Sequence, residues 1–317
     1  MTRKAPGKYR RTGISLMQLA EMFPDEEAAT KWFEFIYWES GRRCGHCQSK
    51  NTKEVPNAKP MPYWCTDCRS YFSVRTGTVL QCTRVPLRKW AFAIYLYVTN
   101  LKGISSMKLH REIHVTQRTA WYMLHRIRTS WEQTGLCDTL GPMEADETYV
   151  GGLEGNKHAS KKLHAGRGAV GKTPVAGVKS RQTNRVVAKV VEDTTSESLL
   201  DDFLFDHIRK GSTIYTDEAK AYKRLDTYDL IHEAVSHSDG EYVREEDIHT
   251  NGIESFWSVL KRAHQGTFHR MSKKHLQRYV TEFVTKHNMR EFDTDEQMAS
   301  IVAGLAGHRL MYESLVL

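Results

Sequence analysis

The sequence lacks long apolar runs, a secretory leader and internal repeats. It contains no run of about 18 apolar residues, so we expect no membrane-spanning helix. The N-terminal segment 1–11 is basic and no apolar stretch follows it directly, which favours a basic arm over a secretory signal. Without repeats or low-complexity tracts, we expect no repeat architecture.

Cysteine is scarce, and its spacing favours a metal site over disulfides. Four of the six cysteines form two Cys-x-x-Cys pairs, separated by residues 48–64. Zinc prefers four thiolate or imidazole ligands in a tetrahedron, and pairs at this separation supply them. We therefore predict a closed structural zinc site at Cys44, Cys47, Cys65 and Cys68. Cys82 and Cys137 have no partner at ligand spacing, so we expect buried thiols there.

Acidic residues are outnumbered by basic ones. The net charge of +8 favours a polyanionic partner, with nucleic acid first and an anionic membrane surface second. A basic protein without such a partner is the alternative. The length allows two or three domains. Changes in composition predict five segments: a basic arm with N-terminal helices (1–40), a zinc ribbon (41–76), a helical region (86–135), an α/β domain (143–290) and a C-terminal helical tail (291–317).

The helical region contains a pattern typical of a helix-turn-helix. Ser105 can cap a short helix, and Thr116 can cap a second one that runs to about Trp131. The second helix carries Arg118 and Arg126, which could contact DNA. The alternative is a helical linker whose arginines face solvent.

The α/β domain has the element order of an RNase H-like fold, a mixed five-stranded sheet with flanking helices. In such a sheet the first and fourth strands are neighbours. Strands are predicted at 144–150, 174–179, 186–191, 213–216 and 230–235. Helices are predicted at 196–208, 219–225, 251–264 and 271–289.

Three acidic residues fall on elements that this fold would bring together. Asp146 lies on the first strand, with Glu144 on the same face and Glu147 on the other. Asp217 follows the fourth strand, and Glu254 lies near the start of the helix at 251–264. Carboxylates in such a group hold two magnesium or manganese ions for phosphoryl transfer. Two local roles remain open: Asp217 could cap a helix, and Asn251 with Glu254 fits a capping box.

Basic side chains surround these acids in the sequence. Lys261 lies two helical turns after Glu254 and could contact a DNA phosphate, or simply face solvent. Residues 166–173 match a phosphate-binding loop, but the segment before them is polar and Pro174 disfavours a following helix. We expect instead a basic loop at 156–172 that contacts DNA through Lys161, Lys162, Arg167 and Lys172.

The acidic segments also carry a family resemblance. The segments are Met143–Gly152, Tyr215–Asp217, His249–Arg262 and Gly266–Tyr279. The chain resembles bacterial insertion-sequence transposases that combine an N-terminal zinc ribbon with an RNase H-like DDE domain. The resemblance implies that Asp146, Asp217 and Glu254 bind the metal ions and that Lys261 contacts DNA. In some relatives the third ligand is an asparagine, so Asn251 and His249 are kept as secondary site residues.

The resemblance further implies a function. Such a protein binds the terminal inverted repeats of its element, cuts the 3′ ends and joins them to target DNA. It works on double-stranded DNA as a homodimer or larger synaptic complex, in the cytoplasm at the nucleoid. A nuclease without strand transfer and a catalytically inert zinc-ribbon DNA-binding protein are the alternatives.

Overall fold

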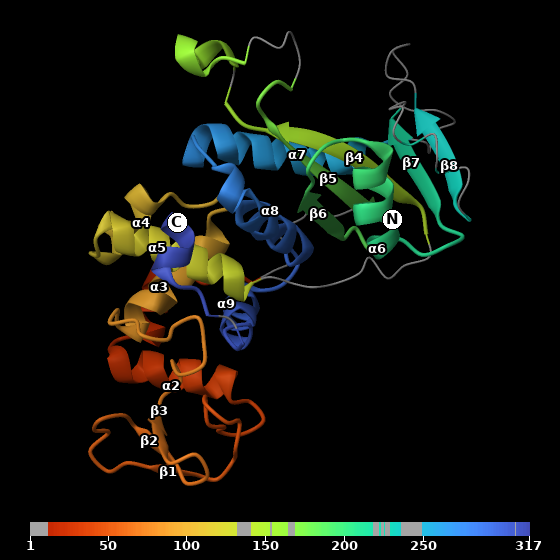
Figure 1. Ribbon diagram of the computed structural model, residues 1–317. Coiled ribbons are helices and arrows are strands. Elements are labelled where there is room, and N and C mark those ends of the chain that lie inside the picture. The colour runs from red at the N-terminus through yellow and green to blue at the C-terminus, as the bar shows by residue number, and fades with distance from the viewer. Residues whose placement is uncertain are drawn as a thin grey trace. The chain divides into compact units, whose positions relative to one another are not determined.

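The computed structural model divides the chain into two compact units (Figure 1): Met1–Glu132 with Met289–Leu317, and Gln133–Asn288. It describes residues 12–131, 141–152, 154–163, 169–217, 222, 225, 229–235, 249–307 and 309–317, with backbone only at 161, 202 and 235. The predicted basic arm, Cys137, Arg167 and the side chain of Lys161 therefore lie outside the described residues.

The first unit begins with two capped helices. Helix α1 spans Leu16–Met22, and helix α2 spans Glu26–Tyr37. The Asp25 carboxylate accepts a 2.8 Å hydrogen bond from the Ala28 amide and so caps α2. Both helices were predicted, because the capping residues and the apolar spacing agree.

A small three-stranded antiparallel sheet follows. Its strands are β1 (Thr52–Glu54), β2 (Tyr63–Cys65) and β3 (Ser70–Phe72). The sequence predicts short strands at 63–65 and 71–74; β2 matches the first, and β3 begins one residue before the second. Strand β1 was missed, since a Thr-Lys-Glu segment shows no apolar alternation. Cys82 lies beyond this sheet and is exposed, so the prediction of a buried thiol was wrong.

The rest of the first unit is a helical core. It contains α3 (Leu87–Thr99), α4 (Ser106–Ile113) and α5 (Gln117–Ser130), capped at the predicted Ser105 and Thr116 for the last two. Helix α9 (Thr294–Ala303) buries Met298, Ile301 and Val302 in the same core, and α10 (Tyr312–Val316) follows it. The C-terminal segment thus completes a core begun by the N-terminal helices.

The second unit is built on a mixed five-stranded sheet with the order β6-β5-β4-β7-β8. The strands are β4 (Met143–Val150), β5 (Thr173–Ser180), β6 (Val186–Val190), β7 (Thr213–Asp217) and β8 (Ile231–Val235). Strand β5 pairs antiparallel with both β4 and β6, whereas β7 pairs parallel with both β4 and β8. The predicted adjacency of the first and fourth strands is confirmed.

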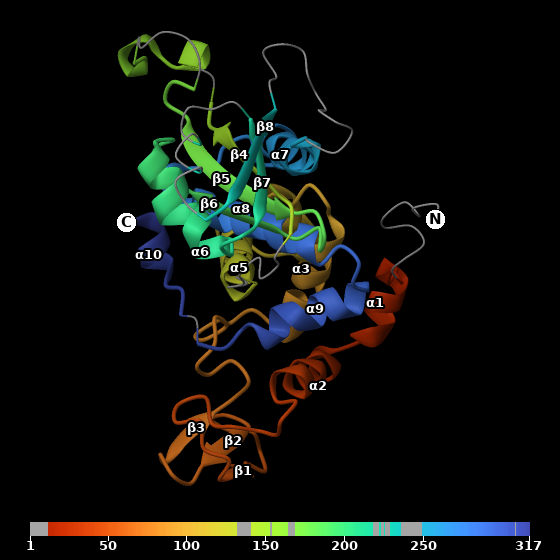
Figure 2. The same ribbon diagram turned by 90° about the vertical axis from the view of Figure 1, so that its right-hand side faces the viewer.

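Helices cover both faces of this sheet (Figure 2). One face packs on α7 (Asn251–Ala263), its continuation η6 (His264–Phe268) and α8 (Lys273–Asn288). The other packs on η3 (Glu197–Leu204) and α6 (Phe205–His207). Most of the helix predicted at 196–208 is a π-helix, which hydrophobic spacing does not distinguish from an α-helix. Short turns η1 (Glu154–Asn156) and η2 (Ala159–Lys161) precede β5. Among the described helices, none is both long and apolar enough to cross a membrane.

Candidate active site and candidate metal centre

Two of the predicted acids lie on adjacent parallel strands. Strands β4 and β7 pair with Glu144 beside Tyr215, and continuing this register by two residues places Asp146 beside Asp217. Glu144 and Asp146 share one face because side chains alternate along a strand. That face is the one covered by α7, since the Ile253 amide reaches the Glu144 carboxylate.

The third acid comes from α7. On the neighbouring strand, Gly177 pairs with Asp146, and a Cβ at Gly177 would lie 2.5 Å from the Trp257 ring. The helix therefore crosses the sheet beside Asp146, and glycine allows this close approach. Glu254 lies one turn before Trp257, is exposed, and accepts a 3.1 Å hydrogen bond from the Thr250 hydroxyl.

The acids interact strongly with one another. Burial, together with the charges of Glu147, Asp217 and Glu254, raises the pKa of Asp146 to about 7. Burial also raises the pKa of Glu147, whose carboxylate accepts a 2.9 Å hydrogen bond from the Tyr222 hydroxyl. Two half-buried carboxylates, Asp146 and Glu147, thus lie near Asp217 and the exposed Glu254, and such a group of acids favours binding of cations.

Glu147 is a site residue that the sequence prediction did not include. Alternation along β4 places it on the opposite face from Asp146, as predicted, and there it meets Tyr222 of the other core. It nevertheless raises the pKa of Asp146. The pattern Asp-Glu was visible in the sequence, but alternation alone gave no reason to expect this coupling.

Glu144 anchors α7 to the sheet. Its relative exposure is 2%, and its carboxylate accepts hydrogen bonds from the Ile253 amide at 2.8 Å and from Arg181 Nε at 2.9 Å. A Cβ on Gly252 would lie 2.6 Å from Glu144 Oε2, so the helix end can approach the carboxylate only with glycine there. Glu144 therefore binds an amide in the first turn of the helix that carries Glu254.

Arg181 connects the three elements that carry the acids. It pairs with Glu144 of β4, stacks 4.1 Å above the Tyr215 ring of β7, and donates to the His249 carbonyl just before α7. His249 also places Nδ1 3.5 Å from Glu144. The predicted secondary residues Glu144 and His249 thus contact this arginine rather than the acid cluster.

Asn251 does not cap α7. The helix begins at Asn251, its N-cap is Thr250, and no side-chain capping bond is formed there. The alternative role of Asn251 and Glu254 as a capping box is therefore excluded, and Glu144 instead accepts a hydrogen bond from an amide of this helix end. Asn251 itself is exposed.

Lys172 and Lys261 lie at a common groove beside the acids. This β4–α7 groove has a volume of about 930 Å³. Its lining includes Glu147, Gly152, Lys172, Lys261, His264 and His269. Lys162 is half-buried on the preceding loop. The groove thus brings together two of the predicted basic residues.

The two predicted arginines of the helix-turn-helix differ in their surroundings. Arg118 is exposed and stacks 4.1 Å from the Tyr312 ring. Arg126 is buried, and its guanidinium donates to the Gln81 carbonyl and the Tyr122 hydroxyl. Its hydrogen bonds hold the helical core together, which leaves Arg118 as the accessible arginine of this pair.

The four predicted zinc ligands form a compact cluster. The ligand atoms of Cys44, Cys47, Cys65 and Cys68 all lie within 4.8 Å of one another. Hydrogen bonding, chiefly from the backbone amide of Cys68, lowers the pKa of the Cys65 thiol to about 7 and so favours its thiolate form. Four sulfurs in one cluster suit a tetrahedral zinc ion. Among the described residues this is the only group of three or more ligands so close, and Asp146, Asp217 and Glu254 do not form such a group.

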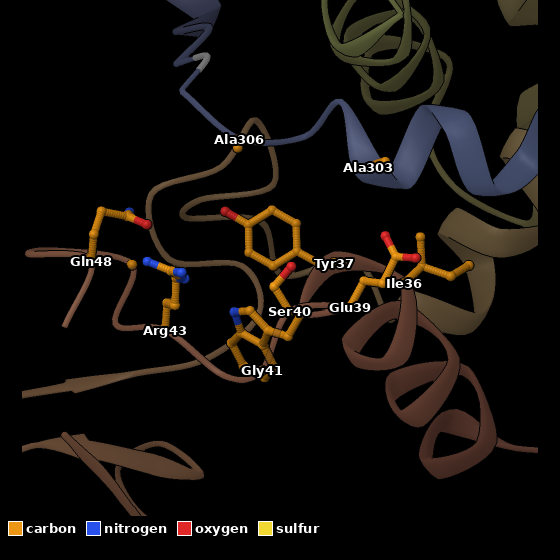
Figure 3. Close-up of a pocket in the computed structure, with 11 residues that line it drawn as sticks. Ile36, Tyr37, Glu39, Ser40, Gly41, Arg43, Gln48, Ala303 and Ala306 are labelled. Atoms are coloured by element: carbon orange, nitrogen blue, oxygen red, sulfur yellow. The ribbon is translucent and has the colours of Figure 1, made fainter. Parts of the chain in front are cut away.

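A separate hollow of about 320 Å³ lies beside the cysteine cluster, within the first unit. Figure 3 shows the Tyr37 ring in the middle of this hollow. Arg43 and Gln48, which flank the first Cys-x-x-Cys pair, lie on one side, and Ala303 of α9 lies on another. Its lining offers hydrogen-bond donors but no group of acids. We therefore assign the candidate reaction chemistry to the second unit.

Comparisons with known proteins agree with this assignment. A family model described as the ISXO2-like transposase domain matches residues 139–288. An uncharacterized protein in transposable element ISH50 of Halobacterium salinarum is 32% identical over 283 residues, which cover 84% of this chain and 92% of that protein. A solved intasome of simian T-cell lymphotropic virus, in complex with the PP2A regulatory subunit B56 gamma, gives 14% identity and a TM-score of 0.29 over 56% of this chain and 67% of that one. Such a score is too low to establish a shared fold.

Glu144→Gln should destabilise the second unit. The change leaves the Arg181 charge without its carboxylate partner in a buried setting, and we expect a loss of about 3 kcal/mol in the free energy of unfolding. The exposed Glu254→Gln should change it by about 0.5 kcal/mol or less. Urea unfolding of both variants tests this, and equal effects would contradict the anchoring role.

Asp146→Asn should stabilise the ion-free protein near pH 8 but not near pH 4. The Asp146 pKa of about 7 exceeds its ordinary value of 3.8, so stability linked to this group is full at low pH and is lost as pH rises toward 7. Asparagine removes that loss. We expect a gain of at least about 1.4 kcal/mol, the equivalent of one pKa unit. Urea unfolding without added magnesium or manganese measures it, and an equal gain at both pH values would argue against the carboxylate repulsion.

Cys44→Ser should reduce the zinc content of the purified protein and lower its melting temperature. A hydroxyl is a poorer ligand than a thiolate, and a three-thiolate site holds zinc less tightly. Cys82→Ser is the matched control, because Cys82 is exposed and lies outside the cluster. Metal analysis and thermal unfolding of both variants provide the test; unchanged zinc in Cys44→Ser would remove this residue from the ligand set.

Proposed function

The chain belongs to the insertion-sequence transposases with an ISXO2-like domain, and we propose that it binds the terminal inverted repeats of its element, cuts their 3′ ends and joins them to target DNA. The proposal draws on the sequence relationship and on the acid cluster of the second unit. The mixed sheet order, with three antiparallel and two parallel strands, supports an RNase H-like assignment for that unit.

The approach of acids from β4, β7 and α7 is the observation that carries the proposal, because the pairing of β4 with β7 places Asp146 beside Asp217 under α7. The charged neighbours that raise the pKa of Asp146 are all acids, namely Glu147, Asp217 and Glu254. Oxygen ligands of this kind fit magnesium or manganese, so Asp146, Asp217 and Glu254 would hold two such ions. When bound, the ions supply an activated nucleophile and stabilise charge on the leaving oxygen.

The surrounding residues position the acids and the DNA. Arg181 and Glu144 contact β4, β7 and the start of α7, and would thereby hold the acids near one another on the face of the sheet that α7 covers. Lys261 and Lys172 would contact phosphates in the β4–α7 groove. Lys162 belongs to the same basic loop, and Lys161 and Arg167 remain predictions from sequence.

The first unit would recognise the transposon ends. The zinc ribbon and the α4–α5 pair are small DNA-binding modules by type, and Arg118 is exposed on the second helix of the pair. Two ends must be processed together, so we propose a homodimer or larger complex on double-stranded DNA, acting in the cytoplasm at the nucleoid.

Cleavage and joining of the element's own ends is the decisive measurement. Purified protein is incubated with end DNA and magnesium, and the nicks are mapped; pre-cut ends are used in a separate joining assay. Asp146→Asn and Asp217→Asn should each reduce cleavage by more than about a hundredfold, since each removes a metal ligand, while end binding stays. Glu254→Gln compared with Asn251→Ala identifies the third ligand.

The alternatives predict different results in the same assays. A nuclease would cut the ends but would not join pre-cut ends to target DNA. An inert DNA-binding protein would bind the ends without metal-dependent nicking. Normal cleavage by either aspartate variant would remove that residue from the proposed site.

A further inference from the structure

The β4–α7 groove carries features beyond the two lysines already assigned to DNA. It starts at Glu147, the residue after Asp146, and follows the second half of β4 to Gly151 and Gly152. Its other wall is formed by the end of α7 and by η6. The groove therefore leads directly away from the candidate metal ligands, and its volume of about 930 Å³ is in the range of ligand sites.

The lining of the groove is rich in side chains that carry nitrogen groups, namely Lys172, Lys261, His264 and His269. Glu147 also lines the groove, but its carboxylate accepts a hydrogen bond from Tyr222 on the other face of the sheet. A DNA strand has a matching requirement: cations must meet the phosphate at the reaction centre, and hydrogen-bond donors must meet the phosphates beside it.

The floor of the groove is largely backbone. A Cβ on Gly152 would meet no atom within 4 Å, so open space lies above this residue. Gly151 adjoins it, and its φ of +158° lies in a region that side chains rarely adopt. A Cβ at Gly151 would lie 3.1 Å from Lys172 Cα, so a DNA strand can approach the main chain closely at Gly152 but not at Gly151.

The wall opposite the floor has an unusual backbone. Helix α7 continues into the π-helix η6, a rare geometry that is frequent at functional sites. It ends at His269, which has a positive φ of 57° and donates its amide to the His264 carbonyl at 2.7 Å. The wide turn places His264, Gln265 and His269 on the groove lining together. Burial and the neighbouring His269 lower the pKa of His264, so its ring is mainly neutral at pH 7 and can donate a hydrogen bond.

We propose that His264, Gln265 and His269 form a binding site for the sugar–phosphate backbone of the DNA strand next to the scissile phosphate. The inference rests on the proposed function, because the reaction centre defines one end of the groove. It adds a class of ligand, a single DNA strand leaving the site, and three contact residues on η6 and at its end.

The test is a double-mutant cycle between the protein and its DNA. Single phosphates on either side of the cut are replaced by uncharged methylphosphonates in a fluorescent duplex of the element's end. Binding is measured by anisotropy without added divalent ions, and cleavage rates are measured with magnesium. The protein variants are His264→Ala, Gln265→Ala and His269→Asn, singly and combined. Asparagine is chosen at His269 because it tolerates positive φ.

With the natural protein, neutralising one or more flanking phosphates should weaken binding or slow cleavage about tenfold to a hundredfold, the effect of one lost hydrogen bond to a charged group. In the combined variant the same neutralisation should have no further effect, because the contact is already gone. Lys210→Ala is the control: Lys210 is exposed and does not line the groove, so its effects should be additive with every phosphate.

The outcomes separate the inference from the function on which it rests. Additive effects in a protein that binds and cuts normally would overturn the inference alone, as would a combined variant with natural binding and rates. Failure of the natural protein to bind or cut end DNA would overturn both. Unchanged melting temperatures confirm that the variants are folded.

Discussion

A single buried ion pair determines the geometry of the second unit's acid cluster. The Glu144 carboxylate is nearly inaccessible, and it joins the first turn of α7 to Arg181 and to β4. Arg181 extends the same contact to Tyr215 on β7. Each of Asp146, Asp217 and Glu254 lies on one of the three elements held in this way. Glu144 lies only two residues from Asp146 on β4. Through its contacts, the Glu144–Arg181 pair also fixes the backbone of β7 and α7, which carry Asp217 and Glu254.

The approach of α7 to the sheet depends on two glycines and on a cap from a neighbouring strand. Close approach of α7 requires Gly177 and Gly252, which remove side chains where the helix meets the strands. The first turn of α7 is capped by Glu144 instead of by its own N-cap residue. Because the cap comes from β4, the start of α7 is held to the sheet while Glu254, the residue after Ile253, stays exposed.

Local signals in the sequence predicted most of the helices and strands. Ser105 and Thr116 each cap the helix they were expected to cap, because capping depends on a few neighbouring residues. The adjacency of β4 and β7 followed from the order of the elements along the chain, and the clustering of the four cysteines followed from their spacing.

Long-range contacts were not predictable in the same way. The burial of Arg126, the exposure of Cys82 and the coupling of Glu147 to Asp146 all depend on which segments pack together. The capping box at Asn251 and Glu254 does not form for the same reason. Its sequence pattern is complete, but the carboxylate of the distant Glu144 accepts the hydrogen bond from the Ile253 amide at this helix end.

The packing of α9 has a consequence for biosynthesis. This helix comes after the whole second unit in the chain, yet it fills the core formed by α2, α3 and α5. On the ribosome, the N-terminal helices must wait for the last part of the polypeptide before their hydrophobic core can close. The segment that binds DNA ends under the proposed function therefore matures only after the reactive unit has been translated, and a prematurely terminated nascent chain would expose apolar surface instead of a finished binding module.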